Sequence, residues 1–240
     1  MEPKTPAQHA RRKPDGSDAR VYGRRKGRPL RASLERLIEE RLPAYAFTLP
    51  ASATLDPRGL FAHRPERVWL EIGFGGGEHL AWQAAAHPEV GLIGSEIFRN
   101  GIATALRALE AAGATNVRLW PDDARLLLER LVPASLDRVF ILFPDPWPKA
   151  RHRKRRLVSD ETLDRLARLI RPGGELRLAT DDEDYLTWML EHLWRHRQDF
   201  RWTAERAADW QTRDWPETRY EAKARAAGRA SIYLSYRRRG

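Results

Sequence analysis

The stretch RVWLEIGFGGGEHL, residues 67–80, decides the fold of this chain. A short apolar run ends at Gly73, and Gly75 and Gly77 follow at alternate positions before a helical pattern begins. Glycines at the end of a first strand allow a tight turn and let a ligand approach the backbone closely. We therefore expect a strand over residues 67–73 and a ligand site at its carboxyl end.

Apolar strand patterns alternate with amphipathic helical patterns along the rest of the chain. A helix is expected over residues 33–42 behind a Ser33 cap, followed by a proline-rich loop region at 43–65. The further strands are expected at residues 90–96, 117–121, 136–147, 175–181 and 231–238. Strand–helix alternation at this spacing predicts an α/β fold, a doubly wound, Rossmann-like sheet that is mostly parallel and carries helices on both faces.

Composition limits the domain organisation. The 240 residues, 42% of them apolar, suffice for one domain with a sizeable core. We expect residues 1–32 to form a basic, largely disordered arm and residues 33–240 a single domain. The absence of cysteine excludes disulfides and a cysteine nucleophile, and suits a reducing compartment. We expect no membrane span, because no run of 18 apolar residues exists, and no secretory signal, because the N-terminus lacks an apolar region.

The positive charge is concentrated in two places. The chain has a net charge of +10, whereas residues 1–32 alone carry a net +7 and the segment KARHRKRR, residues 149–156, a net +6. The remainder is therefore nearly neutral. Such a distribution favours an anionic partner, with nucleic acid first and an anionic membrane second, although arginine as the default surface base would also raise the charge.

Acidic residues accompany the glycine turn. The spacing is G-x-G-x-G, whereas a dinucleotide site has G-x-G-x-x-G. Glu71 precedes Gly73 by two residues, where it would repel a pyrophosphate but attract an ammonium group. Glu96 ends the second expected strand and could accept hydrogen bonds from a ribose diol. Asp123 follows the third and could accept from an adenine amino group, while Asp122 is expected to cap the next helix. The set favours S-adenosylmethionine (SAM) over NAD.

The fourth expected strand ends in the loop FPDPWPK, residues 143–149. Three prolines fix its backbone and hold Asp145 and Trp147 in place. A carboxylate can accept from both donors on the Watson–Crick edge of guanine, and a tryptophan offers a stacking face. A rigid turn with Trp147 in the core is the structural alternative.

A SAM site beside a basic segment favours a methyltransferase that acts on RNA, and three other functions compete with this interpretation. An NAD-linked oxidoreductase disagrees with the glycine spacing, and a non-enzymatic RNA-binding module would not need an intact SAM loop. A SAM-dependent methyltransferase acting on another RNA or on a protein stays open from the residues alone. His192 and His196 stand one helical turn apart without an evident third ligand, so no metal site is expected.

Four segments closely resemble the bacterial tRNA (guanine-N(7)-)-methyltransferase family: EIGFGGGEHL, PDPWPKARHRKRR, ATDDEDY and TRYEAK. The resemblance covers residues 67–236. It implies a seven-stranded Rossmann-like sheet, a bacterial cytoplasmic setting and SAM as methyl donor. We expect the chain to be a monomer or a homodimer. It also implies methyl transfer to nitrogen 7 of a guanine in the variable loop of tRNA, at tRNA position 46.

The resemblance also assigns residues. It implies SAM contacts at Glu71, Glu96, Asp123 and Asp145, beside Gly73, Gly75 and Gly77. It implies substrate contacts at Lys149, Asp181, Thr218, Arg219, Tyr220 and Glu221. Contacts to RNA are expected from Arg151, His152, Arg153, Lys154, Arg155 and Arg156. Guanine nitrogen 7 carries a lone pair at neutral pH and needs no strong base, so placement should supply most of the catalysis, with Asp145 stabilising the developing positive charge.

Overall fold

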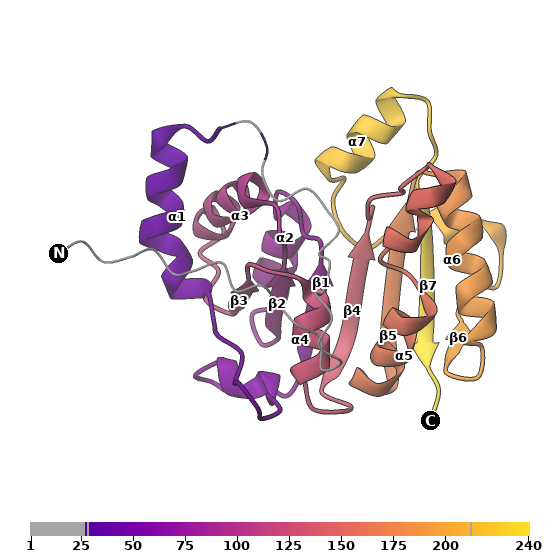
Figure 1. Ribbon diagram of the computed structural model, residues 1–240, viewed down its shortest axis with the longest axis horizontal. Helices are drawn as coiled ribbons and strands as arrows, with labels where there is room; N and C mark the ends of the chain where they lie inside the picture. The colour runs from indigo at the N-terminus through magenta and orange to yellow at the C-terminus, as the bar shows by residue number, and fades with distance from the viewer. Residues whose placement is uncertain (1–26, 28, 212) are drawn as a thin grey trace.

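The computed structural model describes residues 27, 29–211 and 213–240. Its seven strands form one sheet in the order β3-β2-β1-β4-β5-β7-β6 (Figure 1). The strands are β1 Val68–Ile72, β2 Gly91–Ser95, β3 Val117–Trp120, β4 Leu136–Leu142, β5 Ile170–Thr180, β6 Phe200–Trp202 and β7 Ile232–Arg238. β1 to β5 are parallel, and β7 is antiparallel to both β5 and β6. The predicted α/β class and the mostly parallel seven-stranded sheet are confirmed.

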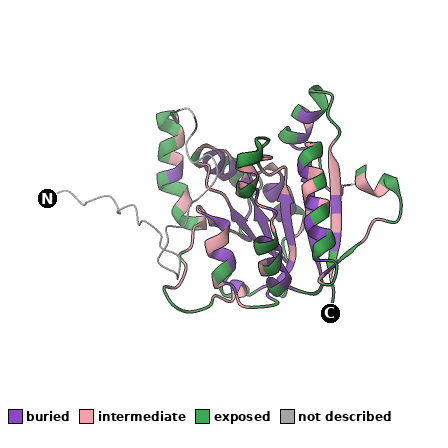
Figure 2. Cartoon of the chain, turned by 45° about the vertical axis from the view of Figure 1, so that its right-hand side comes forward, coloured by how far each residue is buried: buried purple, intermediate pink, exposed green. Residues whose placement is uncertain are grey.

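Helices cover both faces of the sheet. They are α1 Ala32–Tyr45, α2 Glu78–Ala86, α3 Arg99–Ala111, α4 Ala124–Arg130, α5 Asp160–Leu169, α6 Glu183–Arg195 and α7 Arg219–Ala226. Short 3-10 turns are η1 Pro57–Leu60, η2 Ala150–Arg155 and η3 Ala207–Gln211. One core contains buried residues of α4, α5 and α6, and a second contains those of α1, α2 and α3. The central strands β1, β2 and β4 between them are almost wholly buried (Figure 2).

The alternation of side chains along β1 explains why two cores exist. Leu70 and Ile72 belong to the core under α4 to α6, whereas Trp69 belongs to the core under α1 to α3. β4 behaves in the same way, because Ile141 points into the first core and Phe140 into the second. This confirms the prediction that the fourth strand is buried on both faces. Since the chain leaves β1 first toward β2 and later returns to β4, the switch in strand order lies between β1 and β4.

Several sequence-based boundaries were wrong. Ser33 does not cap α1, because the helix begins at Ala32 behind Arg31 and continues to Tyr45. β5 begins at Ile170 instead of residue 175, because Ile170 pairs with Leu136 before a shift in register. β6 and α7 were not predicted at all. Of the expected disordered arm, residues 1–26 and 28 lie outside the described residues.

Candidate active site

A cavity of about 530 Å³ opens at the carboxyl ends of β1, β2, β3 and β4. Its walls come from the glycine turn after β1, the loops after β2, β3 and β4, the start of α5 and the start of α7. This is the switch point of the sheet, where neighbouring loops diverge and leave a crevice for a ligand. The predicted residues Glu71, Gly73, Gly75, Glu96, Asp123, Asp145, Lys154, Arg155, Arg156, Thr218 and Tyr220 all line it.

The glycine turn has the backbone conformation that its sequence predicts. Gly73, Gly75 and Gly77 all have positive φ, at 78°, 55° and 78°. Gly77 is the N-cap of α2, and a Cβ atom there would lie 2.5 Å from the Cβ atom of Ala105 on α3. Gly77 therefore serves close packing between α2 and α3, while Gly73 and Gly75 face the cavity.

Glu96 is held rigidly at the end of β2. Its Oε1 accepts hydrogen bonds from the backbone N–H groups of Ile97 and Phe98, at 2.7 and 2.9 Å. Its Oε2 accepts from the N–H of Gly75 at 2.9 Å, so this carboxylate also ties β2 to the glycine turn. Burial raises the pKa of Glu96, and the charge of Asp145 acts in the same direction, against the lowering effect of these N–H groups.

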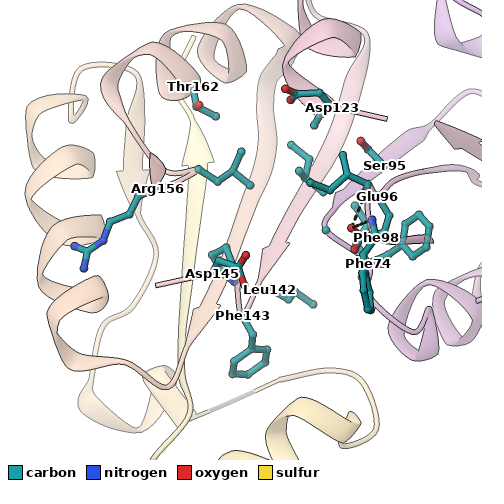
Figure 3. Close-up of a pocket in the computed structure, with 18 of the residues that line it drawn as sticks. Phe74, Ser95, Glu96, Phe98, Asp123, Leu142, Phe143, Asp145, Arg156 and Thr162 are labelled. Carbon is teal, nitrogen blue, oxygen red and sulfur yellow. Dashed lines mark hydrogen bonds between the residues drawn. The ribbon is translucent and has the colours of Figure 1, made fainter. Parts of the chain in front are cut away.

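Asp145 stands on a strained loop after β4. Phe143 and Trp147, on either side of it, both have positive φ, at 50° and 46°, which is costly for residues with a side chain. Withdrawal from bulk water raises the pKa of Asp145. Among the described residues its side chain has no hydrogen-bond partner, so it is free to meet a ligand. Figure 3 shows Asp145 and Glu96 facing the same space from the loops that follow β4 and β2.

Arg156 holds the Asp145 loop in place. Its side chain is 0% exposed, its Nε donates to the carbonyl of Pro146 at 2.8 Å, and its guanidinium pairs with Asp184. The same group stacks over Tyr185 and Trp188, at 4.8 and 5.1 Å from the ring centroids. Figure 3 shows the guanidinium pointing away from Asp145. The prediction that Arg156 contacts RNA disagrees with this burial, because a phosphate cannot reach a guanidinium enclosed by protein.

The rest of the basic segment is more accessible. Residues 150–155 form η2, and Arg151 and Lys154 are exposed, whereas His152, Arg153 and Arg155 are half-buried. Arg155 lies over the ring of Trp147 at 4.9 Å, and Arg153 pairs with Asp184 at 2.7 Å. The segment therefore presents several cations beside the Asp145 loop at the rim of the cavity.

Asp123 caps α4, which corrects the prediction that Asp122 would do so. Its Oδ1 accepts from the N–H of Arg125 at 3.0 Å, and its Oδ2 pairs with the Arg125 guanidinium at 2.7 Å. Asp122 instead accepts from the N–H of Asp123. Asp123 nevertheless lines the cavity, so capping and ligand binding can share one carboxylate.

Comparisons with known proteins agree on the family. The family model described as "Putative methyltransferase" matches residues 65–234. A tRNA (guanine-N(7)-)-methyltransferase of Rhodospirillum rubrum is 56% identical over 229 residues, which cover 92% of this chain and 89% of the relative. One from Rhizobium meliloti is 50% identical over 219 residues, which cover 90% and 94%. This chain belongs to the tRNA (guanine-N(7)-)-methyltransferase family.

The family assignment agrees with the fold. A crystal structure of an rRNA methylase from Streptococcus thermophilus superposes with a TM-score of 0.51 at 12% identity, over 73% of this chain and 88% of that one. At this identity the similarity supports the fold alone. As a tRNA (guanine-N(7)-)-methyltransferase family member, the chain has a Rossmann-like methyltransferase fold, as the resemblance implied.

The TRYE segment of this family member forms the start of α7, a helix that the sequence patterns did not predict. Thr218 and Glu221 make a reciprocal capping box, in which each side chain accepts from the other's backbone N–H. Glu221 is buried and also binds Arg213, at 2.6 Å, and Tyr233. These two predicted substrate residues thus have structural partners already, and the T-x-x-E spacing could have revealed the cap.

Tyr220 and Arg219 bring α7 against the glycine turn. The Tyr220 ring lies so close to Gly75 that a Cβ atom there would meet it at 2.9 Å, and Arg219 lies 3.6 Å from Glu78. Lys149 and Asp181, the other two predicted substrate residues, do not line the cavity. Lys149 is exposed, and Asp181 pairs with Arg229 at 2.8 Å. α7 therefore closes one side of the cavity in this tRNA (guanine-N(7)-)-methyltransferase family member.

Sequence reasoning missed one buried group in the cavity wall. His79, on α2, lies 2.8 Å from Glu71, and both side chains are almost fully buried. The i, i+8 spacing across a turn gives no periodic signal, so only the fold brings the two together. In the part of the chain that the structure describes, no cluster of metal-ligating side chains was found. No described helix has the length and apolar character needed to cross a membrane.

Proposed function

We propose that this chain transfers the methyl group of SAM to nitrogen 7 of a guanine in the variable loop of tRNA, at tRNA position 46. The relatives named as tRNA (guanine-N(7)-)-methyltransferases, matched over nine-tenths of the chain, are the observation that carries this proposal. We expect the reaction to take place in the cytoplasm. The chain has no cysteine and therefore needs no disulfide, which is compatible with reducing conditions.

The order of carboxylates along the sheet fits SAM. Glu71 lies on β1, Glu96 follows β2 and Asp123 follows β3, and these strands are neighbours in the order β3-β2-β1. Their carboxyl ends meet at one edge of the sheet, so the three side chains lie in a row across it. An amino acid ammonium at Glu71, a ribose diol at Glu96 and an adenine amino group at Asp123 would occupy the row in the order in which SAM connects them.

Asp145 lies beyond this row, on the loop after β4, which is the neighbour of β1 on the other side. The base to be methylated would therefore enter between the cofactor and Asp145. Bound SAM supplies an electrophilic methyl group on a sulfonium, and guanine nitrogen 7 supplies the lone pair that accepts it. No proton has to be removed, so the protein's task is alignment of the two.

Asp145 would stabilise the positive charge that the purine gains. Its carboxylate has no partner among the described residues, and the strained loop holds it toward the cavity. A preoriented charge of this kind needs no rearrangement during the reaction. The exposed cations of η2 at the rim would hold the phosphates of the tRNA, while Arg156 keeps the loop in position from behind.

The direct test is methylation of an unmodified tRNA transcript with isotope-labelled SAM, followed by nucleoside analysis. We expect label in 7-methylguanosine, and none in a matched transcript in which the variable-loop guanine is replaced by adenine. Label in both transcripts would place the methyl group elsewhere in tRNA. Label only in an unrelated RNA would favour a methyltransferase of another RNA and refute the tRNA assignment.

A further inference from the structure

A buried histidine lies behind the carboxylate proposed to hold the SAM ammonium group. His79 is in the first turn of α2 and is 4% exposed, as is Glu71 at the end of β1. His79 Nδ1 lies 2.8 Å from Glu71 Oε2. Both residues line the cavity, so the pair is part of its wall.

The second ring nitrogen of His79 is also occupied. Its Nε2 lies 3.0 Å from the amide nitrogen of Gln83, one turn further along α2. In the orientation that the structure gives this amide, its NH₂ group donates to Nε2, which corresponds to the tautomer with the ring proton on Nδ1. The imidazole therefore donates to Glu71.

Two aromatic rings fix the plane of the imidazole. Phe140 and Trp215 pack edge-on against His79, with ring centroids 4.6 and 4.8 Å away. The donor to Glu71 is thus held on three sides, by Gln83 and by the two rings. Such support is typical of a group whose orientation matters.

We propose that His79 is a positioning residue, which orients the carboxylate of Glu71 for the ammonium group of SAM. The inference rests on the proposed function. His79 occupies Oε2 and, among the described residues, leaves Oε1 without a hydrogen-bond partner, available to the ligand. Without a donor, an ionised carboxylate at this depth becomes costly to bury, and the attraction for the ammonium group falls with it.

Two substitutions distinguish a role of His79 as hydrogen-bond donor from a role in packing alone. His79→Phe keeps the aromatic ring between Phe140 and Trp215 but removes the donor. His79→Asn removes the ring but keeps an N–H donor near the position of Nδ1. A positioning role predicts that the Asn variant binds better than the Phe variant, whereas a packing role predicts the reverse. His192, which is 5% exposed and lies outside the cavity wall, provides the matched control as His192→Phe.

Two ligands distinguish binding of the ammonium group from binding of the rest of SAM. S-adenosylhomocysteine carries the amino acid group, and 5′-methylthioadenosine shares its adenosine and thioether but lacks that group. We expect His79→Phe to raise the Kd of S-adenosylhomocysteine about tenfold, in line with loss of one charge-assisted contact. The Kd of 5′-methylthioadenosine should change less than twofold. His79→Asn should recover most of the loss, and His192→Phe should change neither Kd.

Isothermal titration calorimetry on the full chain measures these constants, with circular dichroism to verify folding. Equal losses for both ligands, no loss at all, or weaker binding by the Asn than by the Phe variant would each overturn the inference. If His79→Phe does not fold, His79→Leu provides the donor-free variant, and the comparison with Asn stands. If the unmodified protein binds neither ligand, the proposed function itself fails, which is a separate result.

Discussion

Replacement of Arg156 by alanine tests whether the basic segment contains a structural arginine among RNA-binding ones. The guanidinium is fully buried, donates to the Pro146 carbonyl, and stacks on Tyr185 and Trp188. A hydrogen bond from a charged donor contributes about 1.5–3 kcal/mol. Stacking of a desolvated cation adds about 1–2 kcal/mol, and the ion pair with the solvent-exposed Asp184 adds little, because water screens that carboxylate.

Burying the guanidinium also costs free energy, because the group loses its water. Removing it recovers this cost, which offsets part of the summed stabilisation. We therefore expect Arg156→Ala to lower the free energy of unfolding by about 2–4 kcal/mol, which for a chain of this size is a fall in Tm of roughly 5–15 °C. Turnover should fall as well, because the Asp145 loop loses its support. The salt dependence of tRNA binding should not change, because no phosphate reaches this side chain.

The exposed Arg151 is the matched control. Arg151→Ala should leave Tm within about 2 °C, since surface substitutions shift stability by no more than about 0.5 kcal/mol. It should flatten the log–log salt slope of tRNA binding by about 0.7–0.9, the effect of one lost phosphate contact. Differential scanning calorimetry and filter binding across a salt series measure the two effects. An unchanged Tm together with a flatter salt slope for Arg156→Ala would refute the structural role.

Three further predictions concern the cavity. Asp145→Ala should leave SAM binding largely intact but lower kcat about 10²-fold or more, the scale of losing one preoriented charge contact; near-normal single-turnover methylation would contradict its role. SAM affinity should fall on acidification from a higher pH than an ordinary glutamate would give, because the raised pKa of Glu96 means that protonation removes its charge earlier. Calorimetry over a pH series checks this, and Glu96→Gln should weaken both the affinity and its pH dependence. Gly77→Ala should lower the free energy of unfolding by about 2–4 kcal/mol, because the alanine would need a positive φ and would clash with Ala105. Gly113→Ala should lower it by only about 1–2 kcal/mol, because Gly113 also has a positive φ but has open space around it. Equal melting temperatures for the two variants would argue against the clash.

The sequence by itself determined the architecture and most of the cavity. Period-two and period-3.6 patterns are local, so the strands and most helices could be placed from neighbouring residues alone. Because strand ends of a parallel sheet gather at one edge, Glu71, Glu96 and Asp123 could also be placed together. The strand β6, with three residues, was too short to carry a pattern.

Only the tertiary structure decided what each charged side chain does. Arg151 and Arg156 have the same chemistry and lie five residues apart, yet one is exposed and the other enclosed by α6 and the Asp145 loop. The pairing of Glu71 with His79 likewise depends on how α2 packs over β1. Local sequence cannot fix these outcomes, because the burial of a side chain depends on segments distant in the chain, and burial determines whether a charge binds a ligand or supports the fold.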